Sequence, residues 1–263
     1  MPVLTDKVED QFKAAMNPLT RLAGRLVLIL IWLFPIAQIW AQDRPTRLNV
    51  WDIHIGELAS AIPDGFINYA CGTNGGPPSI PLVNFTGFKK CKPDRNGLHE
   101  VYFEYDDELE YWARALDLKA EIKMYAGTTA YEFPVVASVL FDDTGLTRGQ
   151  RLVTDPRQQL SRDRNEFWML ADFIRHRFGD DGWECKDLPP DEGETPAGSY
   201  FIKNHCEKMQ GNLRLVLEQR YFQKKGQQFV DPYTGKPRTE DYESATRFEM
   251  YDAALPLRRA GVK

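Results

Sequence analysis

The four cysteines are the residues whose spacing most narrows their chemistry. They are Cys71, Cys91, Cys185 and Cys206, so 19 residues separate the first two and 20 separate the last two. A structural zinc site needs closer pairs, and a redox-active pair commonly has the spacing C-x-x-C. An even number of widely spaced cysteines is typical of disulfide bonds in exported proteins. The similar spans favour the local pairs Cys71–Cys91 and Cys185–Cys206, and sequence alone leaves the other connectivities open.

Two histidines stand near an aspartate at spacings that could support acid–base or metal chemistry. Asp52 and His54 alternate on an expected strand, and Asp172 and His176 are four residues apart on an expected helix. Neither pair is accompanied by a nucleophile, an HExxH motif or a second pair of ligands. We therefore expect surface side chains, with no catalytic residue, metal or cofactor.

Two acidic clusters could supply the paired carboxylates of a glycoside hydrolase. The first lies at 106–110 and the second is Asp142-Asp143. Each stands where a turn is expected, and aspartate is common in turns because its side chain bonds nearby backbone amides. A hydrolase that uses an acidic pair on envelope polymers is therefore the alternative function rather than the principal one.

Aromatic side chains between residues 100 and 125 offer a different chemistry. Tyr102, Tyr111 and Trp112 are candidates for an exposed aromatic surface that contacts a partner protein or a glycan. Burial in the core is the more common fate of such residues. These residues support the principal expectation, a non-enzymatic binding or envelope-accessory protein whose partner is an envelope protein or a glycan.

A short apolar segment near the N-terminus has the pattern of a secretory signal. Residues 26–42 contain no charged side chain, two arginines precede them, and Ala41 follows the apolar run. The run is shorter than the roughly 20 residues that a membrane-spanning helix needs. We expect residues 1–41 to be a signal peptide, with Met16 as a possible true start, and a periplasmic or secreted mature chain that does not bind a membrane. The alternative is a structural protein anchored in the inner membrane by residues 26–42.

Length and charge limit the remaining possibilities. The chain has 263 residues, 33 basic and 38 acidic side chains, and a formal net charge of −5. This size corresponds to one or two domains. The acidic balance argues against nucleic acid as a partner, because nucleic-acid-binding proteins usually carry a broad basic surface.

Hydrophobic periodicity predicts the elements that must position these residues. Alternating apolar and polar residues predict a strand at 48–55. Further strands are predicted at 69–71, 85–91, 98–105, 133–141, 146–153, 200–206, 213–222 and 244–251, with another near Trp183. Residues 57–62 fit one or two helical turns. The charges of 109–124 allow helix or strand, and the recurring Tyr, Trp and Ile favour strands.

The strongest helix is predicted over 156–178. Asp155 can cap its start, Gly179 can end it, and Leu170, Ala171 and Ile174 form part of an apolar stripe. Such a stripe must lie on an apolar surface, most simply a sheet. The predicted fold class is α+β, with antiparallel sheet covered by helices.

The surroundings of the two cysteine pairs are similar enough to predict an internal repeat. Seven residues after each second cysteine a leucine opens a strand, Leu98 in one case and Leu213 in the other. The apolar positions of these strands are one residue out of phase, so a bulge or gap is required. We expect two related half-domains, 48–155 and 156–252, followed by a tail at 253–263.

Four segments carry a resemblance to known sequences. They are FDDTGLTRGQRLVTDPR (141–157), CGTNGGPP (71–78), EYDDELEYWARA (104–115) and RFGDDGWEC (177–185). They resemble uncharacterised, predicted-exported proteins of alphaproteobacteria, which implies an envelope location and no catalytic activity. The two expected copies of helix, disulfide loop and antiparallel strands are also similar to the tandem repeats of beta-lactamase inhibitor protein and to small outer-membrane lipoproteins of barrel assembly. This architectural likeness transfers no function.

Overall fold

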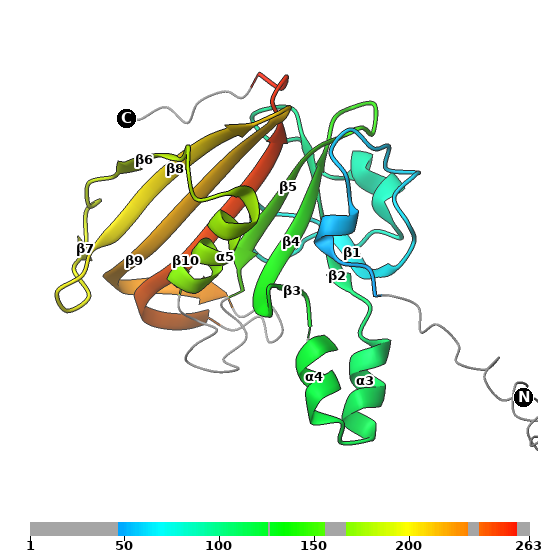
Figure 1. Ribbon diagram of the computed structural model, residues 1–263, viewed down its shortest axis with the longest axis horizontal. Helices are drawn as coiled ribbons and strands as arrows, with labels where there is room; N and C mark the ends of the chain where they lie inside the picture. The colour runs from blue at the N-terminus through cyan, green and yellow to red at the C-terminus, as the bar shows by residue number, and fades with distance from the viewer. Residues whose placement is uncertain (1–46, 126, 156–166, 231–236, 257–263) are drawn as a thin grey trace, which may run out of the picture. The chain divides into compact units, whose positions relative to one another are not determined.

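The computed structural model describes residues 47–125, 127–155, 167–230 and 237–256 (Figure 1). The predicted signal peptide, the first part of the predicted 156–178 helix and the end of the predicted tail lie outside these ranges. Strands make up 42% of the described residues and helices 19%, so the fold is mainly β rather than the predicted α+β. Within the described ranges, no helix is long and apolar enough to cross a membrane.

The described strands form one antiparallel sheet (Figure 1). In spatial order they are β1 (Phe66–Cys71), β2 (His99–Tyr105), β4 (Phe133–Phe141), β5 (Thr147–Thr154), β10 (Pro237–Asp252), β9 (Leu213–Val230), β8 (Ile202–Gln210) and β6 (Glu184–Asp187). Two short strands join this order, since β3 (Thr129–Ala130) pairs with β4 and β7 (Glu194–Thr195) pairs with β9. The strands of the two expected halves meet where β5 pairs with β10, with Leu152 opposite Phe248.

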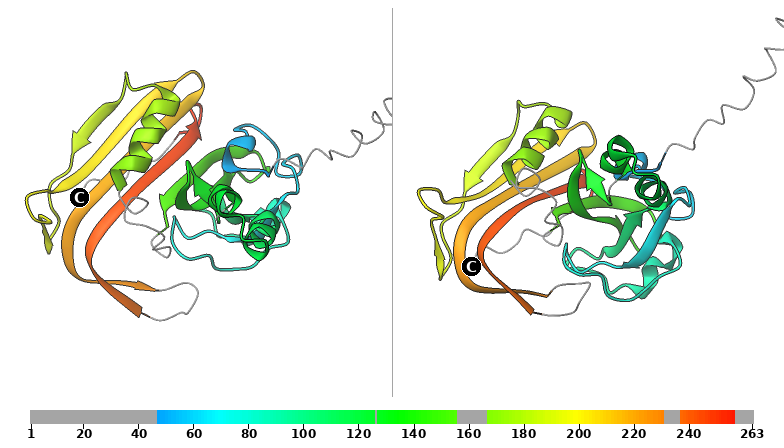
Figure 2. Two further views of the ribbon diagram at one scale, coloured as in Figure 1. Left: turned by 60° about the horizontal axis from the view of Figure 1, so that its bottom comes forward. Right: turned by 90° about the horizontal axis from the view of Figure 1, so that it is seen from below.

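One face of the sheet carries the hydrophobic core. Its alternate positions are apolar and buried, for example Val101 and Phe103 on β2 and Leu215 and Leu217 on β9. Helix α5 (Phe167–Phe178) lies across β9 and β10 on this core face (Figure 2). Its residues Leu170, Ala171 and Ile174 are each at most 1% exposed. The apolar stripe of the predicted helix is therefore part of the core, because its side chains leave water for the sheet surface.

Two short 3-10 helices cover the core face elsewhere, where strands were expected. In η2 (Val50–Asp52) the Asn49 side chain accepts a hydrogen bond from Trp51 N, and Asp52 accepts one from Asn49 N, which together form a capping box. In η3 (Phe85–Lys90) the Asn84 side chain accepts from Thr86 N. The strand predictions at 48–55 and 85–91 are wrong because these caps outweigh the apolar alternation.

The strand prediction for 109–124 is also wrong, because this segment forms two helices. They are α3 (Glu108–Ala115) and α4 (Lys119–Tyr125), which lie side by side at one end of the molecule (Figure 1). Glu110 and Arg114 are four residues apart and form an ion pair of 2.7 Å, because residues at this spacing are neighbours on a helix surface. Glu, Leu, Ala, Arg and Lys favour a helix strongly enough to override the aromatic residues. The helical turns expected at 57–62 are absent, since that described segment forms turns and bends.

Other predicted elements are confirmed. The hairpin of β4 and β5 turns at 142–146, where Gly145 has a φ of +85°, a conformation that glycine adopts without steric cost. Strand β2 begins one residue, and β8 two residues, after the predicted start. Strands β9 and β10 include the predicted segments and are longer than expected. Their length extends both strands beyond the part of the sheet that α5 covers (Figure 1).

Candidate functional site

The face of the sheet opposite α5 carries a charged cluster at its centre, which we call the polar face cluster: Glu100, Arg151, Arg247 and Glu249. Arg151 on β5 is directly opposite Glu249 on β10, and its Nε lies 2.6 Å from Glu249 Oε1. Its Nη1 lies 2.6 Å from Glu100 Oε2 on β2. The Arg151 side chain is only 4% exposed, so one buried guanidinium joins two carboxylates from different strands.

The polar face cluster also holds the loop that follows Cys71. Arg247 donates to Glu249 Oε1, and it also donates to the backbone oxygen and the side-chain oxygen of Asn74 at 2.9 and 2.5 Å. The backbone N–H of Asn74 donates in turn to Glu100 Oε2 at 2.7 Å. The disulfide Cys71–Cys91 thus joins the two ends of the loop, and charged hydrogen bonds hold it at Asn74. Such bonds are among the stronger ones in proteins.

A pocket of about 590 Å³ opens beside this loop, and we call it the polar pocket. Its lining comes from two loops and from strands β2, β5, β9 and β10. The lining residues are Asn74, Asp94, Arg95, Asn96, Glu100, Arg151, Glu218, Arg220, Arg247, Glu249 and Tyr251. Four are arginines, four are acidic and none is aliphatic. Most ligand pockets are largely apolar, and this lining differs from them in being almost entirely polar and charged.

Two carboxylates of the pocket, Glu249 and Glu218, have lowered pKa values because cationic or hydrogen-bonding partners face them. Burial opposes ionisation of Glu249, but the guanidiniums of Arg247 and Arg151 outweigh it and lower the pKa of this carboxyl. Burial likewise opposes ionisation of Glu218, but a hydrogen bond from His205 and the charge of Arg220 lower its pKa. Neither carboxyl therefore holds a proton near neutral pH.

The pKa values of Arg151 and Tyr251 are shifted in the directions that keep the polar face cluster intact. Burial lowers the pKa of Arg151, but Glu249 and Glu100 more than compensate, and the net shift is upward. Burial and the charge of Glu249 raise the pKa of Tyr251, so its hydroxyl remains protonated and donates to Glu249 Oε2 at 2.9 Å. No described group of three or more His, Cys, Asp or Glu side chains is placed to hold a metal ion.

The aromatic residues expected to form a surface are split by the structure. Tyr102 is on β2 and only 2% exposed, so it does not belong to an exposed surface. The alternation of β2 turns its ring toward Ala70 and Val136 on neighbouring strands. Tyr111 and Trp112 are 64% and 54% exposed on α3, with their ring centroids 5.4 Å apart.

The acidic clusters have structural partners. Asp142 accepts hydrogen bonds from Thr144 and Leu146 within the β4–β5 turn, and from Arg148. Although burial opposes ionisation, these bonds lower the pKa of Asp142 to about 2. Asp106 accepts from Glu108 N at the start of α3. As expected for turn residues, these carboxylates bond nearby backbone rather than face a cleft together.

Neither of the two His–Asp pairs considered from the sequence is formed. Asp52 caps η2, while His54 is exposed just beyond it. His176 on α5 contacts Asp180 at 3.1 Å rather than Asp172.

His205 contacts two carboxylates, and its raised pKa predicts a pH effect on stability. Its ring nitrogens lie 3.2 Å from Glu218 and 3.0 Å from Glu207, and these bonds, that of Glu218 foremost, raise its pKa above the ordinary value of 6.5 despite partial burial. This contribution to stability is complete below pH 6.5 and is lost as the pH rises through the raised pKa. From pH 6 to 8.5 we expect the wild type to lose roughly 0.2–1 kcal/mol more than His205→Gln in urea unfolding. Parallel pH profiles of the two proteins would refute this.

The residues of the polar pocket could not be singled out in the sequence. Glu100, Arg151 and Glu249 alternate with apolar residues in their strands, a pattern that indicates a solvent-exposed face. What brings them together is the pairing of β2, β4, β5 and β10, and these strands are distant in the chain. The available signal for a charged cluster was a charged side chain within each of several strands that are otherwise largely apolar.

Comparisons of the chain with protein-family models, curated proteins and solved structures find no match.

Proposed function

We propose that this chain is an exported binding protein whose polar pocket holds a hydroxyl-rich glycan of the cell envelope. The observation that carries the proposal is the balanced lining of the pocket, four guanidiniums against four carboxylates. A strongly charged ligand would meet as much repulsion as attraction there. A neutral ligand with many hydrogen-bonding groups meets neither penalty.

Sugar hydroxyls fit both kinds of lining group. A hydroxyl donates to a carboxylate and accepts from a guanidinium, whereas a ligand with acceptors alone uses only half of the lining. Arg95 and Arg220 are the guanidiniums with the most spare donors, since among the described residues Arg220 pairs only with Glu218 and Arg95 has no partner. Both are exposed enough to reach a ligand.

The same lining favours binding over hydrolysis. A glycoside hydrolase needs one carboxyl whose raised pKa keeps it protonated as the general acid. The pKa values of Glu218 and Glu249 are lowered instead, by His205 and by arginines. The hydrolase alternative therefore has less support than a glycan-binding role.

Two disulfide bonds fit a location outside the reducing cytosol. We propose a periplasmic or secreted protein, released by cleavage after Ala41. Retention of residues 26–42 in the product isolated from its host would indicate the anchored alternative.

The test is glycan binding by the purified protein and two arginine variants. An array of envelope glycans, including peptidoglycan fragments, identifies a ligand, and titration calorimetry measures its affinity. Arg220→Ala removes a donor of the pocket and leaves Glu218 paired with His205. We expect about a tenfold loss of affinity, equivalent to the ~1.4 kcal/mol of one good hydrogen bond. Arg114→Ala on α3 is the matched control and keeps wild-type affinity. Binding of no glycan, or equal affinity of Arg220→Ala and the wild type, would contradict the proposal.

A second candidate function is contact with a partner protein through α3. Tyr111, Trp112, Leu116 and Leu118 are all exposed within eight residues, and such clustering of apolar side chains marks interaction sites. Acidic residues surround them, so the partner would be basic at its rim. Trp112→Ser separates the two candidates. A glycan that occupies the pocket binds Trp112→Ser normally, whereas binding of a partner protein through α3 is lost in this variant.

We also propose that the two halves are related by duplication. Strands β1-β2-β4-β5 form one meander and β6-β8-β9-β10 form another, and the last strands of the two meanders pair with each other. The first strand of each meander carries the first cysteine of its pair. In this proposal β2 corresponds to β8, whereas the sequence comparison of Leu98 with Leu213 matched β2 with β9. Failure of the two meanders to superimpose in an experimental structure would contradict the relation.

A further inference from the structure

The disulfide Cys185–Cys206 lies in an unusual position for a structural bridge. Cys185 is on β6, the outermost strand, all of whose residues are exposed. Cys206 is directly opposite it on β8 and is fully buried. One sulfur-bearing residue therefore meets solvent while its partner does not.

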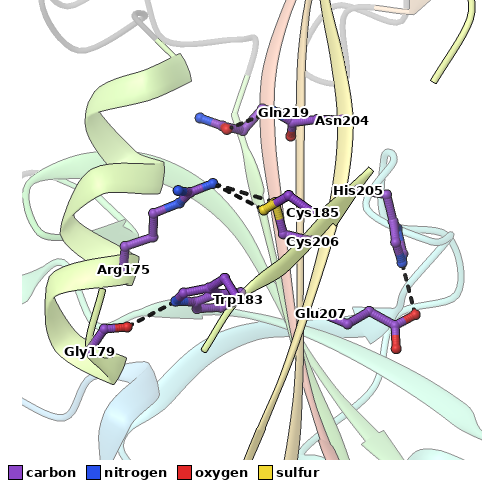
Figure 3. The surroundings of a disulfide bond; sticks show 9 residues. All are labelled: Arg175, Gly179, Trp183, Cys185, Asn204, His205, Cys206, Glu207 and Gln219. Carbon is purple, nitrogen blue, oxygen red and sulfur yellow. Dashed lines mark hydrogen bonds and ion pairs between the residues drawn. A yellow bond between two sulfur atoms is a disulfide. The ribbon is translucent and has the colours of Figure 1, made fainter. Parts of the chain in front are cut away.

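A guanidinium is directed at this bridge from the neighbouring helix. Arg175 Nη2 on α5 lies 3.4 Å from Cys206 Sγ and 3.7 Å from Cys185 Sγ (Figure 3). Arg175 forms no ion pair with a carboxylate in the described part of the chain, and its buried Nε has no hydrogen-bond partner there. Arg175 is partly buried, so leaving its guanidinium without an anionic partner carries a cost, and a neutral disulfide sulfur is only a weak acceptor.

A thiolate at Cys206 would supply the anion that Arg175 lacks. Thiolates next to arginine are stabilised, and a stabilised thiolate is also a better leaving group in disulfide exchange. Arg175 thus favours release of Cys206 as a thiolate, whereas Cys185 is the exposed residue that an incoming thiolate can reach. We propose that Cys185–Cys206 is a thiol–disulfide exchange site, at which an external thiolate attacks Cys185.

Two thiols of the reductant balance the atoms and electrons of the exchange. The thiolate of a reductant such as glutathione attacks Cys185 Sγ, and a new disulfide joins it to Cys185. The Cys185–Cys206 bond breaks, and its electron pair goes to Cys206 Sγ as a thiolate beside Arg175. A second thiolate then attacks the mixed disulfide, which releases Cys185 and oxidises the reductant. Opening would remove the covalent tie of β6, which among the described strands pairs only with β8.

The other bridge is an internal control. Cys71 and Cys91 are 3% and 2% exposed, and no described cationic group contacts their sulfurs. An attacking thiolate would reach neither sulfur without local unfolding, and the released thiolate would have no adjacent positive charge. The two bridges should therefore differ in reactivity within one molecule.

The experiment exposes the folded protein to reduced glutathione and traps free thiols by alkylation over time, with peptide mass spectrometry to locate them. We expect Cys185–Cys206 to open at least about tenfold faster than Cys71–Cys91, with glutathione attached to Cys185. Arg175→Gln should slow the opening about tenfold, and Arg175→Lys should restore part of the rate. Arg114→Gln, far from either bridge, is the control.

Three outcomes would overturn the proposal. They are equal opening of the two bridges, attachment of glutathione to Cys206, and an unchanged rate in a folded Arg175→Gln variant. If Arg175→Gln does not fold, the comparison of the two bridges and the attachment site in the wild type still decide the question.

Discussion

Replacing Ile174 with aspartate is expected to leave the protein without a stable fold. Ile174 is 0% exposed and lies in the contact between α5 and the core face of the sheet. Losing the buried aliphatic side chain costs roughly 2–5 kcal/mol, and burying a carboxylate without a partner adds several more. Together these reach the ~5–15 kcal/mol total stability of a typical protein.

Circular dichroism and urea unfolding measure this effect. Two controls separate the buried charge from a general effect of changing α5. Ile174→Val should cost only about 0.5–1.5 kcal/mol, because it removes one methylene group without adding a charge. Asp172→Ala, on the exposed side of the same helix, should change stability by less than about 0.5 kcal/mol. A folded Ile174→Asp protein with a wild-type melting curve would show that α5 is not part of the core.

The elements that could be predicted from sequence are those specified by nearby residues. The hairpin of β4 and β5 has its turn residues between two apolar runs, and the stripe of α5 follows helical spacing. The two disulfides join cysteines of similar local spacing. In each case the signal and the structure lie within about twenty residues.

Short segments were predicted less well because two local preferences compete there. In α3, tyrosine and tryptophan favour a strand, while the Glu110–Arg114 pair and good helix formers favour a helix. In η3, two phenylalanines and a threonine favour a strand by propensity, but the Asn84 cap starts a helical turn instead. With fewer than about ten residues, neither preference accumulates enough free energy to be decisive in a sequence pattern.

The polar pocket could not be predicted because its residues meet only through non-local pairing. Arg151 and Glu249 are 98 residues apart in the chain and directly opposite in the sheet. A shift of one residue in the pairing of β5 with β10 would place the arginine next to an apolar side chain instead. Burial of this ion pair therefore makes the register of the central strands costly to change.

Arg151→Met is expected to destabilise the protein by roughly 3–5 kcal/mol at pH 7.5, the usual cost of removing one partner from a buried ion pair. The methionine fills similar space, but Glu100 and Glu249 remain buried without the guanidinium that joined them. Their mutual repulsion and their desolvation then oppose folding. Urea unfolding with constant m-values measures the change.

The pH dependence identifies the cause of this loss. In the wild type the pKa of Glu249 is lowered, so its contribution to stability is present above the carboxyl pKa of the unfolded chain and is lost as the pH falls through the lowered value. Without Arg151 the pKa of this carboxyl rises, and protonation relieves the buried charge. The stability gap between wild type and variant should therefore narrow from pH 7.5 to 5. Combining Arg151→Met with Glu100→Gln and Glu249→Gln should recover most of the loss at pH 7.5, because no ionised carboxylate then remains buried. A gap that is independent of pH, and that persists in the triple variant, would attribute the loss to packing rather than to the unpaired carboxylates.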